Sequence, residues 1–147
     1  MPPNDSHNLN RFIAAQETVY PTALAELKNG QKRTHWMWFI FPQAAGLGFS
    51  STSQYYAIQS LEEARQYLTH PVLGVRLREC AEVLLTVEGR SVSQIFGYPD
   101  DLKLKSSMTL FARAADDPHP VFVRVLEKYF HGEQDSKTLD ILVKFST

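Results

Sequence analysis

Apolar residues recur at intervals of three and four through most of the chain, and this spacing limits the fold more than any other feature. Between residues 72 and 87 the recurring residues are Leu73, Leu77, Cys80, Ala81, Leu84 and Leu85. Residues at this spacing lie on one face of a helix, which can then pack on a core. Sustained two-residue alternation of apolar and polar residues is absent from the sequence. The sequence therefore predicts a mainly α protein, a single compact helical domain with at most minor strand content.

Turn and capping residues divide this pattern into about seven helices. The first helix is expected to start near residue 9 and to end at Asn29–Gly30, and Pro21 either kinks it or splits it in two. Ser60 and Ser91 each precede a Glu or Gln by three residues, which is the pattern of a capping box. The later helices are expected over residues 60–69, 72–87, 91–97, 100–115, 121–130 and 135–142.

Three local features complete the prediction of secondary structure. Asp100 or Asp101 is expected to cap the helix that ends near residue 115, because a carboxylate accepts the free N–H groups of a helix start. Trp36–Phe41 is rich in aromatic residues and is the candidate strand. Residues 44–53 contain two glycines and four Ser or Thr, which predicts a loop.

Length and charge restrict the class of protein. A chain of 147 residues has the size of one domain, expected over residues 9–147 after a flexible tail at residues 1–8. The net charge of −1 provides no global field that would recruit nucleic acid. The single cysteine, Cys80, excludes an internal disulfide and fits a reducing, cytoplasmic setting. No secretory leader and no apolar run of membrane length is visible, and the oligomeric state stays open.

The familiar signatures of cofactor and metal enzymes are missing from the sequence. It contains no P-loop, no dinucleotide-binding glycine motif, no nucleophile elbow and no His-Glu-x-x-His motif. The histidines stand at positions 7, 35, 70, 119 and 131, and no two of them are four residues apart on a helix. We therefore expect neither a metal nor a cofactor. Cys80 lies on an apolar face and is expected to be a buried side chain rather than a nucleophile.

The aromatic segment at residues 32–43 is the first candidate for a binding site. Flat rings next to cations and an amide suit a nucleobase or a nicotinamide ring, through stacking and hydrogen bonds. Residues 39–41 are expected in the core, whereas His35, Trp36 and Gln43 are expected to edge a pocket. Tyr56 follows the predicted loop and could close the same pocket. The alternative is that these rings only pack in the core.

Residues 101–111 form the second candidate. Lys103, Lys105 and Ser106 stand near a helix start, where cations are unfavourable unless they bind an anion such as phosphate. Asp101 is the most plausible carboxylate for general acid or base chemistry, and His35 is the other catalytic candidate. A solvated basic turn explains the lysines equally well.

Two segments of the chain resemble a known family. HWMWFIFPQ at residues 35–43 and SSMTLF at residues 106–111 resemble the bacterial DUF1810 proteins, sometimes labelled calpastatin-like, whose function is unknown. The resemblance extends from about residue 9 to residue 142.

More distantly, the order of features is similar to the NADAR group, helical proteins linked to NAD and ADP-ribose metabolism. Residues 53–60, 70–80 and 102–111 match three helical segments of that group. Its members are implicated in cleaving N-glycosidic bonds to ribose or ADP-ribose, so the resemblance implies a NADAR-like fold and pocket. Ser53 stands where that group has a glutamate. A serine cannot act as a general acid or base at neutral pH, so Ser53 is a ligand-binding candidate only.

Three functions are therefore considered. The first is an N-glycoside hydrolase or related hydrolase that acts on a ribosyl or ADP-ribosyl nucleotide. The second is a module that binds ADP-ribose or a similar nucleotide without turnover, which the missing glutamate favours. The third is a protein-interaction scaffold whose aromatic residues are fully packed. The first two imply a small nucleotide-like ligand as partner.

Overall fold

The computed structural model describes residue 5 and residues 7–145. This part of the chain forms ten α-helices and no strand, apart from one isolated parallel bridge between Ala44 and Ile58. The mainly α prediction is confirmed. The helices are α1 (Asn10–Gln16), α2 (Tyr20–Lys28), α3 (Met37–Ile40), α4 (Ser51–Tyr55), α5 (Leu61–Thr69), α6 (Leu73–Thr86), α7 (Val92–Phe96), α8 (Asp100–Ala114), α9 (Val121–Phe130) and α10 (Ser136–Phe145).

The helix count exceeds the predicted seven for three reasons. The first predicted helix is split in two, and Pro21 stands in the first turn of α2, where its missing N–H costs nothing. The candidate strand Trp36–Phe41 is instead the short helix α3, so that prediction is wrong. The predicted loop at residues 44–53 runs into another short helix, α4. Helices of one turn are too short to show a periodic pattern in the sequence.

The predicted caps are mostly confirmed. Ser60 and Ser91 each accept a hydrogen bond from the N–H three residues on, and Ser91 with Gln94 forms a complete capping box. Asp135 caps α10, because its carboxylate accepts the Thr138 N–H at 2.9 Å. The prediction for α8 is wrong, since Pro99 holds the cap position and both aspartates lie within the first turn. Carboxylates there still stabilise the positive end of the helix dipole.

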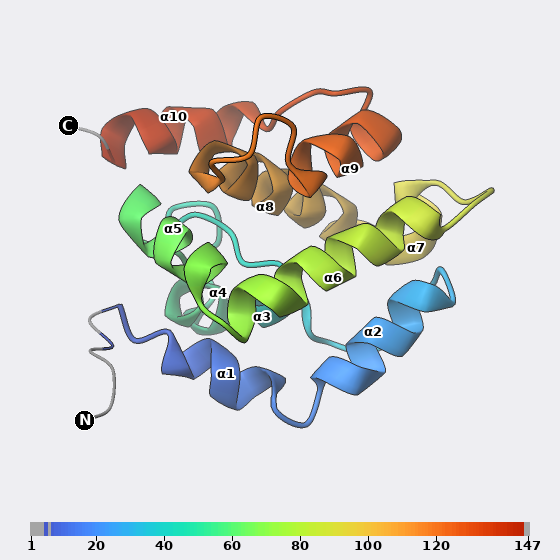
Figure 1. Cartoon of the computed structure of the whole chain (residues 1–147), viewed down its shortest axis with the longest axis horizontal. Coiled ribbons are helices and arrows are strands. Elements are labelled where there is room, and N and C mark those ends of the chain that lie inside the picture. Colours follow the sequence, from blue (N-terminus) through green and yellow to red (C-terminus); the bar gives the residue numbers. More distant parts are fainter. Residues whose placement is uncertain (1–4, 6, 146–147) are drawn as a thin grey trace.

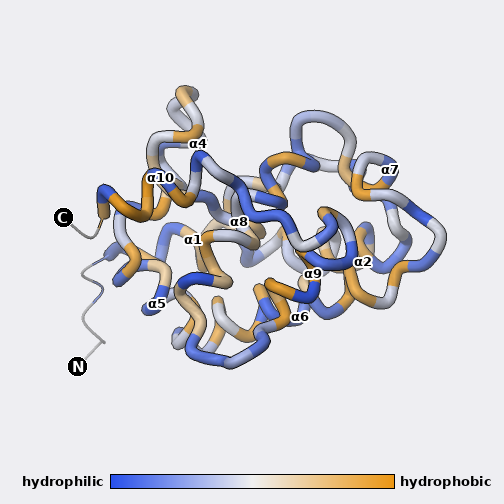
Figure 2. Tube along the Cα trace, turned by 90° about the horizontal axis from the view of Figure 1, so that it is seen from above, coloured by the Kyte–Doolittle hydropathy of each residue, from blue (hydrophilic) through white to orange (hydrophobic). Residues whose placement is uncertain are grey.

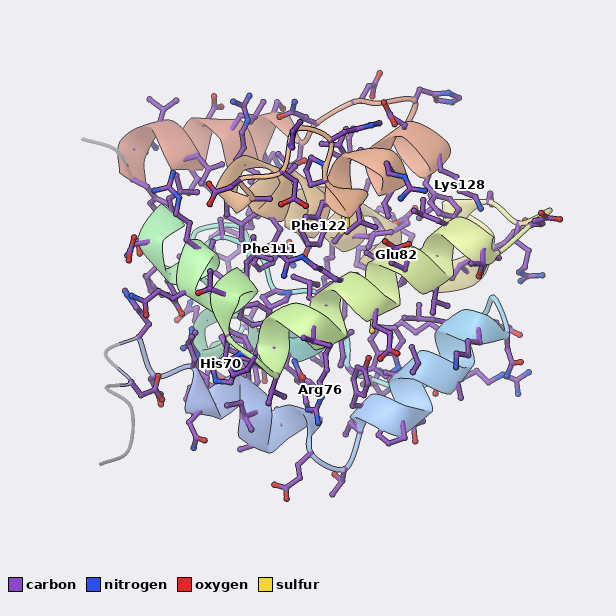
Figure 3. The ribbon with its side chains drawn as sticks, in the orientation of Figure 1. His70, Arg76, Glu82, Phe111, Phe122 and Lys128 are labelled. Carbon is purple, nitrogen blue, oxygen red and sulfur yellow. The ribbon has the colours of Figure 1, made fainter. Side chains whose placement is uncertain are left out.

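The helices pack around α6 and α8. The longest helices meet there: α8 packs on α5, α9 and α10, while α6 packs on α2, α5 and α9. Figure 1 shows α8, α9 and α10 along one side of the molecule and α1 and α2 along the other, with α6 between them. Phe111 on α8 and Phe122 on α9 (Figure 3) are both fully buried, and their ring centres lie 5.9 Å apart. Apolar and polar stretches alternate along the helices, as Figure 2 shows, and the long helices α6 and α8 bury most of their apolar residues in this core.

A buried ion pair fixes the first helix. The Arg11 guanidinium lies 2.7 Å from the Glu63 carboxylate on α5 and also donates to the carbonyl oxygens of Tyr55 and Ala57. The predicted tail at residues 1–8 falls partly outside the described residues, which exclude 1–4 and 6. Of the described part, Asp5 accepts hydrogen bonds from the N–H groups that start α1. Among the helices that the structure describes, none combines the length and apolar character needed to span a membrane.

Candidate functional site

The segment at residues 43–58 forms a closed loop on the surface of the helical body. Its two ends are joined at the isolated bridge, where the Ala45 N–H donates to the Ile58 carbonyl at 2.8 Å and the Ile58 N–H donates to the Gln43 carbonyl at 2.9 Å. The loop carries α4, and its residues 47–50 and 53 line one cavity together with residues 135–137 at the start of α10. Loops of this kind, tied at the base, commonly line binding sites.

Two adjoining chambers lie under this loop, which we call the inner and the outer chamber. The inner chamber has a volume of about 200 Å³ and lies between α3 and the loop. The outer chamber has a volume of about 590 Å³ and lies between the loop, α8 and the start of α10. Trp38, Gln43, Gly48 and Ser53 line both chambers. Because they share these four residues, the chambers adjoin one another, and we call the two together the cleft.

The inner chamber is polar but uncharged. Its described lining contains the amides of Gln43, Gln54 and Gln59 and the ring of Tyr56, with no charged side chain. Burial raises the pKa of the Tyr56 phenol, which therefore stays protonated at neutral pH. Amides and a phenol both donate and accept hydrogen bonds. This lining suits an uncharged polar group.

The outer chamber is cationic. Lys103 and Lys105 come from α8, and Lys137 comes from the first turn of α10. The described lining also includes Asp135, so three ammonium groups and one carboxylate give a net charge of +2. A positive field in a cleft attracts anions such as phosphate.

The acidic neighbours of these lysines hold them only weakly. Lys103 Nζ lies 3.4 Å from an Asp100 oxygen, and Lys105 Nζ lies 3.3 Å from a Glu133 oxygen. Both pairs are partly exposed, and ion pairs of this kind contribute about 0–1 kcal/mol. The ammonium groups are therefore available to a ligand.

Trp38 stands at the boundary between the two chambers. It lines both of them, and the Lys103 ammonium lies 5.3 Å from the centre of its ring. Phe49 stands at the outer mouth with 88% of its surface exposed, although a large apolar side chain normally avoids water. The cleft thus offers one half-buried ring and one exposed ring to a planar ligand.

The predicted role of Trp36 needs a correction. Trp36 is completely buried, and its indole N–H donates to the Glu26 carboxylate at 2.9 Å. The adjoining tryptophan, Trp38, lines the cleft instead. Because residues 37–40 are helical, residues two apart point in different directions, whereas in a strand they would share a face.

The two catalytic candidates lie outside both chambers. His35 is exposed on the segment before α3 and does not line the cleft. Asp101 lies in the first turn of α8, where its carboxylate accepts hydrogen bonds from the Ser93 hydroxyl and the Leu102 N–H. Asp101 therefore serves the helix start, and neither residue belongs to the lining of the cleft.

The structure does bring together six of the predicted ligand-binding residues. Residues more than 40 positions apart in sequence line the two chambers: Gln43, Ser53, Tyr56, Lys103, Lys105 and Ser106. The described part of the chain contains no cluster of three or more His, Cys, Asp or Glu side chains suited to a metal ion.

Sequence reasoning missed Asp135, Lys137 and Phe49 as parts of the cleft. Asp135 caps α10, and its carboxylate accepts the Thr138 N–H and hydroxyl, at 2.9 and 2.6 Å. Lys137 is the second residue of α10, two positions after that cap, so a cation just inside a helix start was the available signal. No sequence signal indicates that α10 lies across from the loop.

Comparison with known proteins gives two matches. The profile of a family described as "Protein of unknown function (DUF1810)" matches residues 6–142. The crystal structure of the conserved hypothetical protein Rv1873 from Mycobacterium tuberculosis is similar, with a TM-score of 0.92 and 52% identity. The match covers 95% of this chain and 99% of the other. None of the curated proteins compared with the chain matches it.

Proposed function

The chain belongs to the DUF1810 family, and we propose that it binds a phosphate-bearing, nucleotide-like small molecule in the two-chamber cleft. One observation carries this proposal: a cationic chamber adjoins an uncharged, amide-lined chamber across a single tryptophan ring. A nucleotide has the same division, with an anionic phosphate at one end and an uncharged ring at the other.

The outer chamber has the size for this ligand class. Its volume of about 590 Å³ lies within the usual range of about 300–1,000 Å³ for small-molecule sites. Two different helices supply its cations, since α8 carries Lys103 and Lys105 and α10 carries Lys137. An anion in the chamber would therefore meet cations from both helices. Ser106, on α8, also lines this chamber, although its hydroxyl donates to the Leu102 carbonyl at 3.2 Å. The resemblance to the NADAR group that we expect from the sequence is the reason to test ADP-ribose or a relative as the ligand.

Binding without turnover fits the cleft better than hydrolysis. Glycosidases usually need two carboxylates across the bond that breaks. Among the residues of the cleft lining that the structure describes, Asp135 supplies the one carboxylate, and that carboxylate is bonded to Thr138 as the cap of α10. Asp101 and His35 lie outside the chambers. We therefore favour the binding module over the N-glycoside hydrolase.

Calorimetric titration with ADP-ribose tests the proposal. Lys105→Ala and Lys137→Ala should each weaken binding about tenfold, because a hydrogen bond to a charged group contributes roughly 1.5–3 kcal/mol. Lys28→Ala is the matched control, since Lys28 is exposed at the end of α2 and lines neither chamber. Equal weakening by all three variants, or no binding by the wild type, would contradict the proposal.

A turnover assay separates the binding module from the hydrolase. The wild-type protein is incubated with NAD and with ADP-ribosylated nucleobases, and free base is measured by chromatography. We expect ligand binding with no base released above the rate in buffer. Release of base that depends on Asp135 would favour the hydrolase instead. A protein-interaction scaffold would give neither binding nor release.

A further inference from the structure

We propose that the inner chamber is a subsite for the uncharged planar ring of the ligand, reached past Trp38, while the ligand's phosphate stays in the outer chamber. This inference rests on the proposed function, and it specifies which end of the ligand occupies which chamber. The two chambers differ so strongly in charge that a nucleotide has one favourable orientation.

Size is the first argument. The inner chamber holds about 200 Å³, which is below the usual range of about 300–1,000 Å³ for a complete small-molecule site. It can therefore take a fragment such as one ring system, but not a whole nucleotide. The remainder of the ligand must lie in the larger outer chamber, which shares Trp38, Gln43 and Ser53 with it.

Unused hydrogen-bonding groups are the second argument. Within the described part of the chain, no side chain or backbone group bonds to the Tyr56 hydroxyl or to the side-chain amides of Gln43 and Gln59. Gln54, by contrast, donates to the Phe49 carbonyl at 3.1 Å and helps to hold the loop. Three free groups that donate and accept match the edge of a nitrogen heterocycle, which presents both kinds of atom.

Charge is the third argument. A phosphate placed in the inner chamber would leave water without gaining a cation, because the described lining has no Lys or Arg. In the outer chamber it meets Lys103, Lys105 and Lys137. The Lys103 ammonium, 5.3 Å from the Trp38 ring centre, lies at the junction, where the sugar or the first phosphate would pass.

The loop makes a tight contact with α4 where it borders the two chambers. A Cβ atom at Gly48 would lie 2.5 Å from the Ser53 Oγ, so only glycine permits this close approach of the loop to α4. Ser53 is held in turn by Ser50, whose carbonyl accepts its hydroxyl at 2.9 Å. Gly48 and Ser53 both line the two chambers, so this tight turn is part of the wall that the chambers share.

Three probes separate the ring from the phosphate: adenosine, pyrophosphate and ADP. Their affinities are measured by calorimetry for the wild type, Ala45→Phe, Tyr56→Phe and Lys105→Ala. Ala45 and Tyr56 line only the inner chamber, whereas Lys105 lines only the outer chamber. Ala45→Phe fills space, and Tyr56→Phe removes one hydroxyl but keeps the packed ring. Tyr55→Phe is the matched control, because Tyr55 is 56% exposed and lines neither chamber.

We expect Ala45→Phe to weaken the binding of adenosine and of ADP about tenfold or more. Tyr56→Phe should weaken the binding of both ligands severalfold. Neither variant should change the affinity for pyrophosphate. Lys105→Ala should weaken the binding of pyrophosphate and of ADP and leave the affinity for adenosine unchanged. The melting temperature of each variant is measured first. If Ala45→Phe fails to fold, Tyr56→Phe alone tests the inner chamber.

Three results would overturn the inference in distinguishable ways. If both inner-chamber variants bind ADP within twofold of the wild type while Lys105→Ala weakens it, the ring lies elsewhere and the proposed function stands. If the wild type binds none of ADP, ADP-ribose or pyrophosphate, the proposed function falls and the inference falls with it. Loss of pyrophosphate binding in the inner-chamber variants would also contradict the division of the cleft.

Discussion

Protonation of Glu26 should release the segment that leads into the cleft. Its Oε1 accepts three hydrogen bonds, from the N–H groups of Arg33 and Thr34 and from the Trp36 indole, at 2.7, 3.1 and 2.9 Å. Its Oε2 accepts the Thr34 hydroxyl at 2.7 Å. One carboxylate of α2 thus holds the chain immediately before α3, which carries Trp38.

The structure gives the size of this effect. Burial alone would raise the pKa of Glu26, but the hydrogen bonds from Arg33, Thr34 and Trp36 outweigh it and lower the pKa from 4.5 to about 2. At 1.36 kcal/mol per pKa unit, the ionised form stabilises the folded protein by about 3 kcal/mol at pH 7. Since the folded pKa is the lower one, this stability is present above about pH 4.5 and is lost as pH falls toward 2.

Glu26→Gln isolates the charge. The amide oxygen can keep the three bonds of Oε1, and its nitrogen can donate to the Thr34 hydroxyl, so the shape of the contact is preserved. We expect the variant to lose about 3 kcal/mol of unfolding free energy at pH 7 but only about 1.4 kcal/mol at pH 3. Glu26→Ala should lose more at both pH values, because it leaves buried donors without partners.

Denaturant unfolding at pH 7, 5, 4 and 3, followed by tryptophan fluorescence, gives these differences. Glu62→Gln is the charge-matched control, since Glu62 is exposed on α5. The common acid destabilisation from other carboxylates cancels when each variant is subtracted from the wild type. A difference between wild type and Glu26→Gln that is the same at pH 7 and pH 3 would refute the reasoning.

Three further predictions concern the core. Phe122→Ala should lower the unfolding free energy by about 3–5 kcal/mol, because Phe122 is fully buried, and denaturant titration measures this. Gly74→Ala should prevent stable folding, since a Cβ atom would lie 2.0 Å from the rigid Leu68 carbonyl oxygen; circular dichroism of the purified variant checks it. Burial raises the pKa of the Cys80 thiol to about 12, so the folded protein should resist a thiol reagent at pH 8 and react in urea.

The long helices were predictable because their residues repeat a local pattern. The face at residues 73–85 fills the core as α6, and Ser91 with Gln94 forms the predicted cap, since both depend on residues a few positions apart. Short helices were not predictable in this way. Residues 37–40 complete one turn, so their aromatic composition favoured a strand, and the surrounding helices decided otherwise.

The candidate site shows the same division between local and long-range information. The sequence indicated that Gln43, Lys103 and Lys105 were unusual, because their chemistry stands out against a helical background. It could not distinguish Trp36 from Trp38. That distinction depends on the Glu26 carboxylate, ten positions away, which draws the Trp36 indole into the core.

The sequence by itself determined the helical class, most helix boundaries, the apolar core and the family. Periodicity, capping and motif identity all act over a few residues, so they can be read along the chain. The tertiary structure alone decided that the loop at residues 43–58 lies across from α8 and α10, which gives one cleft with a cationic chamber and an uncharged chamber. It also placed Asp101 and His35 outside that cleft. Such placements depend on contacts between distant segments, and no local pattern encodes them.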